Sequence, residues 1–222
     1  LAKRAGKVAS IELDTRLLPI LRETLGGFDN VRVIQGDAMK LDISRLLEEE
    51  FPGMPVGVCA NLPYYITTPI IMGLLESGIP FPAIVVMIQK EVAQRMMASP
   101  GGKEYGVLSI AVQFYADAEI CLSVPRGCFI PAPNVDSAVI RLTPRPHPTC
   151  RPKDPDLFFK VIRAAFGQRR KTLLNAMSNA GCFPASKQQM EEILLELGMN
   201  PAARGETLSM EQFAQLSDAL SE

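Results

Sequence analysis

The chain has 222 residues, of which 47% are hydrophobic and 21% are charged, and its net charge is −1; this composition is typical of a globular protein with one large and one small domain. Its apolar runs are far shorter than the roughly 20 residues that span a bilayer, and its first residues lack the apolar core and cleavage site of a signal peptide, so we expect a cytoplasmic protein without membrane contact. Five scattered cysteines with no Cys-x-x-Cys pair, and a single histidine at His147, argue against a disulfide framework, a metal site and a Ser/His/Asp hydrolase.

Segments with strand and helix patterns alternate through the first 115 residues. Short apolar runs predict strands, and apolar residues at intervals of three and four predict helices. The alternation favours a mostly parallel, doubly wound α/β sheet that is covered on both faces and binds ligands at the carboxyl ends of its strands. The sequence Thr67-Thr68-Pro69 is expected to supply a cap and a first-position proline for the third helix. The strands are expected at residues 7–13, 31–34, 56–60 and 83–88, and the helices at 14–26, 43–50, 67–76, 90–98 and 107–115.

The chain changes character between residues 143 and 150. Two apolar runs, 118–124 and 137–142, have no helix-length segment between them and predict an antiparallel pair that ends the sheet. The proline-rich stretch 143–149 prevents regular structure, and the later apolar patterns have the helical period. We therefore predict an α/β domain over residues 1–145 and a small all-helical domain over residues 150–222.

Positive charge is concentrated in one part of the chain. Residues 150–180 hold seven basic and two acidic side chains, although the whole chain has a net charge of −1. This asymmetry indicates a surface that binds a polyanion; a solvated helix face is the alternative. The candidate binding residues are Lys160, Arg163, Arg169, Arg170 and Lys171.

Acidic residues follow the first two predicted strands. Glu12 ends the first strand, where an acid chelates ribose hydroxyls in a doubly wound nucleotide site, and Leu13 could cover one face of an adenine. Asp37 follows Gly36 after the second strand and could accept a hydrogen bond from an adenine amine. Each acid also has an equally simple structural interpretation, Glu12 as a helix cap and Asp37 as a turn residue.

The third predicted strand is followed by Asn61-Leu62-Pro63-Tyr64, which fits the methylation of an aromatic amine. The lone pair of the exocyclic amine of adenine is delocalised into the ring, so a catalyst must localise it. The side-chain oxygen of Asn61 and the carbonyl near Leu62 can accept both amine protons, and Pro63 has no N–H that would compete. Tyr64 can stack on the base, a contact worth roughly 1–3 kcal/mol. No general base is needed, because the methylated amine becomes acidic and loses its proton to solvent, so catalysis is mainly positioning.

Six segments form a combination that is far more specific than any one of them. They are Ile11-Glu-Leu-Asp14, Gly36-Asp-Ala38, Asn61-Leu-Pro-Tyr-Tyr-Ile-Thr-Thr-Pro69, Gln89-Lys-Glu-Val-Ala-Gln-Arg95, Phe129-Ile-Pro-Ala-Pro-Asn-Val-Asp-Ser137 and Phe166-Gly-Gln-Arg-Arg-Lys-Thr-Leu-Leu-Asn175. Together they resemble the ribosomal RNA adenine dimethyltransferase family of the bacterial KsgA (RsmA) type. The resemblance covers the whole chain, and the last segment favours this type over the related erythromycin-resistance methylases.

The resemblance implies a Rossmann-like fold that uses S-adenosylmethionine and releases S-adenosylhomocysteine, with no metal. The implied reaction is N6,N6-dimethylation of two adjacent adenines near the 3′ end of small-subunit (16S) ribosomal RNA during ribosome biogenesis. A target base in a structured RNA must be unstacked and turned into the pocket. The implied partners are this RNA and the small ribosomal subunit, and the implied oligomeric state is a monomer whose helical domain binds RNA.

The resemblance also implies roles for individual residues. Glu12 would bind the ribose of the cofactor, Asp37 with Ala38 its adenine, and Asn61 would lie between the cofactor and the target amine. Phe129 would form the second wall of the base pocket, opposite the tyrosine of the Asn-Leu-Pro-Tyr motif. A phenylalanine before Pro-x-Pro is as commonly a loop anchor packed on the core, and this alternative stays open.

The sequence departs from the family pattern at its start. The family carries a Gly-x-Gly-x-Gly loop after its first strand, and this sequence begins after both. The resemblance places that strand in the middle of the sheet, between the strands near Lys7 and Val56. We therefore expect these 222 residues alone to bind S-adenosylmethionine poorly and to have little activity; micromolar binding in calorimetry would contradict this.

Two other functions fit part of the pattern. A DNA adenine methyltransferase, or another adenine-N6 methyltransferase, would use similar chemistry, but the DNA enzymes more often have two prolines in the motif and are not expected to carry the helical tail with Arg169-Arg-Lys171. A non-catalytic RNA-binding ribosome-assembly factor on the same fold would not need Asn61 or Tyr64. Methyl transfer to unmethylated small subunits, with and without Asn61→Ala, separates the three functions.

Overall fold

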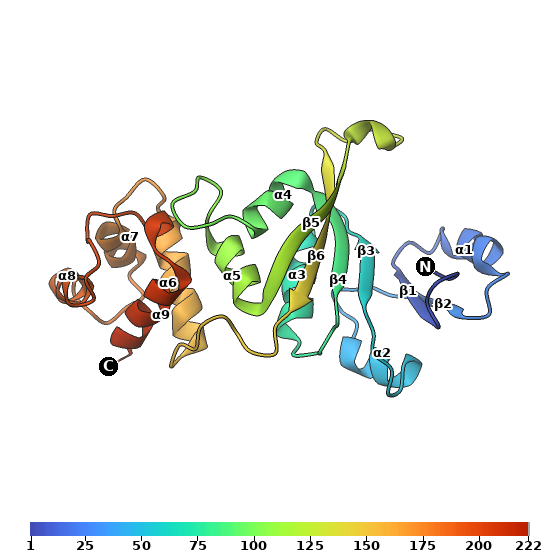
Figure 1. The fold of residues 1–222 in the computed structure, drawn as a ribbon, viewed down its shortest axis with the longest axis horizontal. Helices are drawn as coiled ribbons and strands as arrows, with labels where there is room; N and C mark the ends of the chain where they lie inside the picture. Colours follow the sequence, from blue (N-terminus) through green and yellow to red (C-terminus); the bar gives the residue numbers. More distant parts are fainter. Residues whose placement is uncertain (222) are drawn as a thin grey trace.

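The computed structural model describes residues 1–221, which extend along one long axis (Figure 1). A parallel pair of strands near the N-terminus lies at one end, a four-stranded sheet occupies the middle, and the C-terminal helices form the other end. Among these residues, no helix combines the length and apolarity needed to cross a membrane.

The N-terminal sheet is a parallel pair that has no buried apolar core. β1 (Val8–Glu12) is hydrogen-bonded to β2 (Val31–Gln35), with α1 (Leu18–Leu25) between them and α2 (Ile43–Glu50) after them. Within residues 1–61, no hydrophobic side chain is fully buried. This part of the chain therefore gains little stability from apolar packing.

A buried carboxylate supports the N-terminal part instead. Glu50, at the end of α2, is only 3% exposed. One of its carboxylate oxygens lies 3.1 Å from Nζ of Lys7, and the other accepts a hydrogen bond from Arg32 on β2. These ion pairs tie α2 to the strand pair, because each cation comes from that sheet or the residue before it.

The four-stranded sheet has the order β3-β4-β6-β5. β3 and β4 are parallel, whereas β6 pairs antiparallel with both β4 and β5. The sequence predicted the antiparallel pair, and the structure confirms it. The elements are β3 (Val58–Asn61), α3 (Thr67–Glu76), β4 (Ile84–Gln89), α4 (Lys90–Met96), α5 (Val107–Tyr115), β5 (Ala116–Val124), the 3-10 turn η1 (Arg126–Cys128) and β6 (Ser137–Pro144).

One face of this sheet carries the apolar core. Alternate residues of β4 and β6 are buried there and pack against α3, α4 and α5. The other face carries half-buried or exposed side chains such as Cys59, Val85 and Arg141. The prediction of helices on both faces is therefore wrong for this sheet within residues 1–221. The core strand residues are Ile84, Val86, Ile88, Ala138, Ile140 and Leu142.

The prediction of one mostly parallel sheet is also corrected by the structure. β1 and β3 are not hydrogen-bonded to each other, and each forms an edge of its own sheet within the described residues. This is the position where the resemblance places the first strand of the family. Because β1 and β3 share no backbone hydrogen bonds, the strand register of one sheet does not fix that of the other.

Two helix starts differ from the sequence prediction for local reasons. The helix expected from Asp14 begins at Leu18, because the Asp14 carboxylate accepts hydrogen bonds from the backbone and side chain of Arg16 and forms a turn. The expected threonine cap of α3 is absent. Thr67 is the first residue of the helix, and its hydroxyl donates to the carbonyl oxygen of Pro63 at 3.1 Å.

The C-terminal helices share a core with α5. Side chains cap four of them, namely Asp154, Thr172, Ser186 and Ser209, each accepting hydrogen bonds from the first turn. Buried residues of these helices form one apolar cluster with residues of α5, including Phe114. The elements are α6 (Pro155–Gly167), α7 (Leu173–Ala180), α8 (Lys187–Glu196), the 3-10 turn η2 (Gly205–Thr207) and α9 (Met210–Ala219).

Candidate active site and RNA-binding residues

The segment after β3 presents two hydrogen-bond acceptors without partners. Asn61 is exposed at the last position of β3, and its carboxamide makes no hydrogen bond with a described residue. The Leu62 N–H donates to the carbonyl oxygen of Met87 at 3.2 Å, and the side chain of Leu62 is only 7% exposed. No backbone N–H of residues 1–221 donates to the carbonyl oxygen of Leu62. Both acceptors that amine methylation requires are therefore available on a segment anchored to β4.

Tyr64 is held at a fixed position close to these acceptors. Its hydroxyl lies 2.8 Å from Oγ of Ser137, the first residue of β6, and 36% of the residue is exposed. The Pro63 carbonyl accepts hydrogen bonds from the N–H of Ile66 and the hydroxyl of Thr67. The ring is therefore fixed from its backbone and from its hydroxyl, with part of its surface open.

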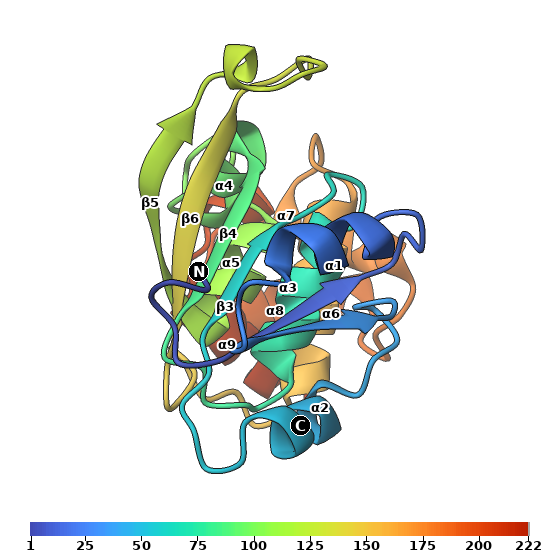
Figure 2. The ribbon, with the colours of Figure 1, turned by 90° about the vertical axis from the view of Figure 1, so that its right-hand side faces the viewer.

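Phe129 belongs to a segment that projects from the sheet. The chain between β5 and β6 extends beyond the ends of both strands (Figure 2). Phe129 is half-buried there, directly after η1, and makes no aromatic ring contact with another described residue. The structure does not bring Phe129 and Tyr64 into ring contact, so their pairing across a base stays a prediction.

The two acidic candidates lie together at the carboxyl end of the strand pair. The Gly36 N–H donates to the backbone carbonyl of Glu12 at 3.0 Å, which places Asp37 beside the end of β1. One carboxylate oxygen of Glu12 accepts the Asp14 N–H at 2.7 Å, and one of Asp37 accepts the Met39 N–H at 2.9 Å. Each side chain thus makes a turn contact, and its second oxygen makes no hydrogen bond with a described residue.

The surroundings of these two carboxylates are open and charged. Leu13 is 62% exposed, and Ala38 is exposed as well. Hydrogen bonds from Arg16 lower the pKa of Asp14 to about 2, so Asp14 stays ionised next to Glu12. The structure therefore groups Glu12 with Asp37 on one sheet and Asn61 with Tyr64 on the other, without hydrogen bonds between the two sheets.

The predicted basic residues fall into two classes. Arg163, Arg170 and Lys171 are exposed, and their side chains make no ion pair with a described residue. Arg169 is different, because its guanidinium lies 3.4 Å from a carboxylate oxygen of Glu206 and donates to the carbonyl oxygen of Lys103. It joins the segment after α6 to η2 and to the segment before α5. Its positive charge is therefore already partly neutralised.

Lys160 on α6 also has a partner. Its Nζ lies 5.7 Å from the ring centroid of Phe183, a cation–π contact. This contact leaves the charge accessible, since Lys160 is exposed. Of the five predicted basic residues, the structure thus leaves all but Arg169 with a charge that is not neutralised by a carboxylate.

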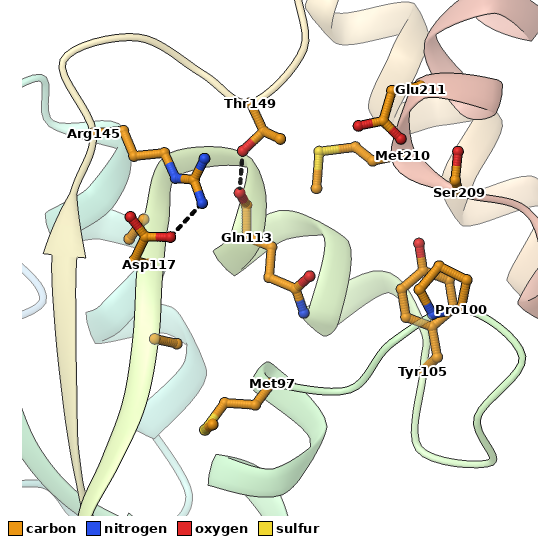
Figure 3. A pocket seen from close by; sticks show the side chains of 12 residues that line it. Met97, Pro100, Tyr105, Gln113, Asp117, Arg145, Thr149, Ser209, Met210 and Glu211 are labelled. Carbon is orange, nitrogen blue, oxygen red and sulfur yellow. Dashed lines mark hydrogen bonds and ion pairs between the residues drawn. The ribbon is translucent and has the colours of Figure 1, made fainter.

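A separate cavity of about 340 Å³ is lined by residues of α5, β5 and α9 and of the segments beside them (Figure 3). It is formed where the segment after α4, the start of β5 and the start of α9 meet. Met97 and Met210 line it together with the Tyr105 side chain and the ion pair of Arg145 with Asp117. None of the site residues predicted from the sequence lines this cavity, and residues 1–221 contain no cluster of three His, Cys, Asp or Glu side chains arranged for a metal.

Sequence reasoning did not assign a role to Ser137, Glu206 or Lys103. Ser137 ends one of the quoted segments, but its contact with Tyr64 joins residues 73 positions apart. Glu206 and the Lys103 carbonyl are 37 and 66 positions from Arg169. Separations of this size leave no local pattern from which the contacts could be read.

Solved structures identify the class of protein. The chain matches the crystal structure of a dimethyladenosine transferase from Plasmodium falciparum with a TM-score of 0.72 and 28% identity, over 95% of this chain and 80% of that one. It matches a structure of the 23S rRNA methyltransferase ErmE with a TM-score of 0.68 and 25% identity, over 100% of this chain and 85% of that one. The fold is thus that of a Rossmann-like methyltransferase.

The family follows from the sequence comparisons. The family model described as ribosomal RNA adenine dimethylase matches residues 1–222. Proteins named ribosomal RNA small subunit methyltransferase A from a Geobacillus species and from Bacillus mycoides are each 54% identical over 222 residues, 99% of this chain and 76% of the relative. The chain belongs to the ribosomal RNA adenine dimethylase family, a family of S-adenosylmethionine-dependent enzymes that dimethylate adenine in ribosomal RNA.

Proposed function

We propose that this chain is the catalytic and RNA-binding part of an enzyme that forms N6,N6-dimethyladenosine at two adjacent adenines near the 3′ end of small-subunit ribosomal RNA. The observation that carries the proposal is the pair of unpartnered acceptors at Asn61 and Leu62, next to a fixed aromatic ring. The small-subunit relatives support this choice of RNA. We further propose that residues 1–145 catalyse, that residues 150–222 bind RNA, and that the enzyme acts as a monomer.

The hydrogen-bond acceptors at the strand ends fit S-adenosylmethionine. The second carboxylate oxygen of Glu12 is available for ribose hydroxyls. That of Asp37 lies 3.9 Å from Nζ of the exposed Lys40 and makes no hydrogen bond, so it can accept one from the adenine amine of the cofactor. Exposed Leu13 and Ala38 offer apolar surface beside them. When bound, S-adenosylmethionine supplies an electrophilic methyl group. No residue in this proposal binds a metal.

In this proposal, the chain itself contributes to catalysis by binding the target amine through hydrogen bonds and orienting it. The carboxamide oxygen of Asn61 and the carbonyl oxygen of Leu62 accept the two amine protons, which directs the nitrogen lone pair out of conjugation with the ring. Tyr64 stacks on the purine and holds it out of the RNA stack. Pro63 contributes no N–H, so no donor competes for the lone pair. Phe129 closes the other side of the base in this proposal.

RNA binding depends on the cations that carboxylates do not neutralise. Lys160, Arg163, Arg170 and Lys171 are exposed on α6 and on the segment that follows it. Cations at a surface bind phosphates with an affinity that falls as salt rises. In this proposal they bind the RNA backbone, while Arg169 holds the segment in place through Glu206 and Lys103.

The proposal is tested by methyl transfer from tritiated S-adenosylmethionine to unmethylated small subunits. The assay compares wild type with Asn61→Ala, in a chain of the same length as the relatives. Loss of one aligned hydrogen-bond acceptor is expected to lower kcat by roughly 100- to 1,000-fold, while stability changes by less than about 0.5 kcal/mol because Asn61 is exposed and unpaired.

Asn200→Ala, at an exposed asparagine between α8 and η2, is the control and should keep full activity. Normal methylation by Asn61→Ala would refute the role of Asn61 and favour a different catalytic site, whereas RNA binding without methyl transfer by the wild type would favour the non-catalytic factor. Equal activity on duplex DNA would favour the DNA methyltransferase alternative.

A further inference from the structure

Ser137 is a fully buried polar residue on the face of the sheet that faces away from the apolar core. It starts β6, where it pairs with Gln89 of β4 and Val124 of β5. Successive strand residues point to opposite faces, and Ala138 is buried in the core, so Ser137 points to the other face. Along β6 that face also carries half-buried Val139 and exposed Arg141. Even so, the exposed fraction of Ser137 is 0%.

The side chain of Ser137 has one hydrogen-bonding partner among the described residues. Its Oγ lies 2.8 Å from the hydroxyl oxygen of Tyr64. Burying a hydroxyl without a hydrogen-bonding partner is costly. This contact therefore gives the Ser137 hydroxyl its partner and, at the same time, fixes the far end of the Tyr64 ring. The near end of Tyr64 belongs to a segment held to β4 by the hydrogen bond between Leu62 and Met87.

Fixation at both ends matters because the ring is the surface on which a base would stack. A tyrosine bound only through its backbone can change χ1 and χ2 on a fast timescale. The bond to Ser137 removes that freedom, so the plane of the ring is set before any base arrives. Catalysis that depends on positioning is sensitive to displacements of about 1 Å.

We propose that Ser137 is a positioning residue for the methylation reaction, which acts by holding the Tyr64 ring in the orientation that receives the target adenine. The inference rests on the proposed function. It adds β6, through one hydroxyl, to the active site that the segment after β3 builds. Ser137 itself touches neither the base nor the methyl donor.

The test combines a measurement on the protein alone with a kinetic one. The enzyme, at the length of the relatives, is labelled with 3-fluorotyrosine, and the ¹⁹F resonance of Tyr64 is assigned by its loss in Tyr64→Phe. Ser137→Ala should shift or broaden that resonance in the free protein. In methyl transfer to unmethylated small subunits, Ser137→Ala and Tyr64→Phe should each lower kcat by about 2- to 10-fold, the worth of one hydrogen bond between neutral groups.

Three further readouts separate positioning from a structural effect. The double variant should be no slower than the slower single variant, because both substitutions remove the same bond. KM for the subunit should stay unchanged, because phosphate contacts elsewhere dominate RNA affinity. Ser109→Ala is the matched control: Ser109 is equally buried and donates a hydrogen bond to the Arg95 carbonyl, so its loss should cost stability but change neither kcat nor the Tyr64 resonance.

Failure of the inference can be told from failure of the proposed function. If Tyr64→Ala and Asn61→Ala abolish methylation while Ser137→Ala keeps the wild-type kcat or resonance, the function stands and the role of Ser137 is refuted. Multiplicative losses in the double variant, or a change in KM alone, would also refute it. If Tyr64→Ala and Asn61→Ala methylate normally, both proposals fall.

Discussion

Replacing Phe114 by alanine should destabilise the α/β part and the helical part together. Phe114 lies on α5 and is 3% exposed. Its ring centroid lies 4.9 Å from that of Tyr115, 5.3 Å from that of Phe158 and 5.2 Å from that of Phe159. The two last rings belong to α6, so the side chain joins the helix that packs on the sheet to the first C-terminal helix.

The expected loss can be worked out from burial. Removing a buried phenylalanine side chain costs about 3–5 kcal/mol, for lost transfer free energy plus a cavity, and the ring pairs are part of that figure since such terms do not add. Total stabilities are about 5–15 kcal/mol. For a chain of 222 residues, each kcal/mol lowers Tm by about 2–4 °C, so Phe114→Ala should lower Tm by roughly 6–20 °C.

Differential scanning calorimetry and urea unfolding followed by circular dichroism check this prediction. Because the apolar cluster is continuous between α5 and the C-terminal helices, we expect the transition of both parts to move. Phe183→Ala is the control, since Phe183 is half-buried at the edge of the same cluster, and it should cost less than half as much. Two separate transitions, of which Phe114→Ala shifts one and leaves the other, would refute the reasoning.

Three further predictions concern charge and titration. Replacing Arg170 and Lys171 by Glu should weaken binding to small-subunit RNA in filter-binding assays and lessen the salt slope by about 1.5, since two phosphate contacts are lost; unchanged affinity in moderate salt would contradict the RNA-binding assignment. Burial raises the pKa of Tyr105 to about 12, so the unfolded chain loses this proton first and the free energy of unfolding falls as pH rises from about 10 to 12. Urea unfolding should show that, between pH 9 and pH 11, the free energy of unfolding falls by about 1 kcal/mol less in Tyr105→Phe than in wild type. An identical fall in both proteins would exclude the effect. Glu50→Gln should lower the free energy of unfolding by about 1–3 kcal/mol, because the buried side chain loses its charged hydrogen bonds to Lys7 and Arg32. Wild-type stability in thermal unfolding would show that these ion pairs contribute nothing.

Local sequence patterns determined most of the elements. Apolar runs predict the strands that the structure has at β1, β2, β3 and β4, because a buried strand needs nothing more than a short apolar segment between turns. The error at α1 arises where a side chain competes with the helix. The Asp14 carboxylate binds Arg16, and this turn replaces the first helical turn.

The candidate site also has features that follow from local sequence and features that depend on tertiary contacts. The order of Asn61, Pro63 and Tyr64 along the chain is enough to predict acceptors and a ring at one strand end, because these groups are neighbours in sequence. Whether the acceptors are free depends on contacts with β4 and β6, and no spacing in the sequence reveals those contacts.

The sequence alone therefore determined the family of the chain and the excess of positive charge in residues 150–180, and it predicted the chemistry at the end of β3, since each depends on residues that are close together along the chain. Only the tertiary structure decided that Ser137 anchors Tyr64, that Arg169 is bound by Glu206 and Lys103, and that Phe114 joins two parts of the molecule. These contacts depend on how strands and helices pack in space, which brings together side chains that are distant in sequence and that no local periodicity connects.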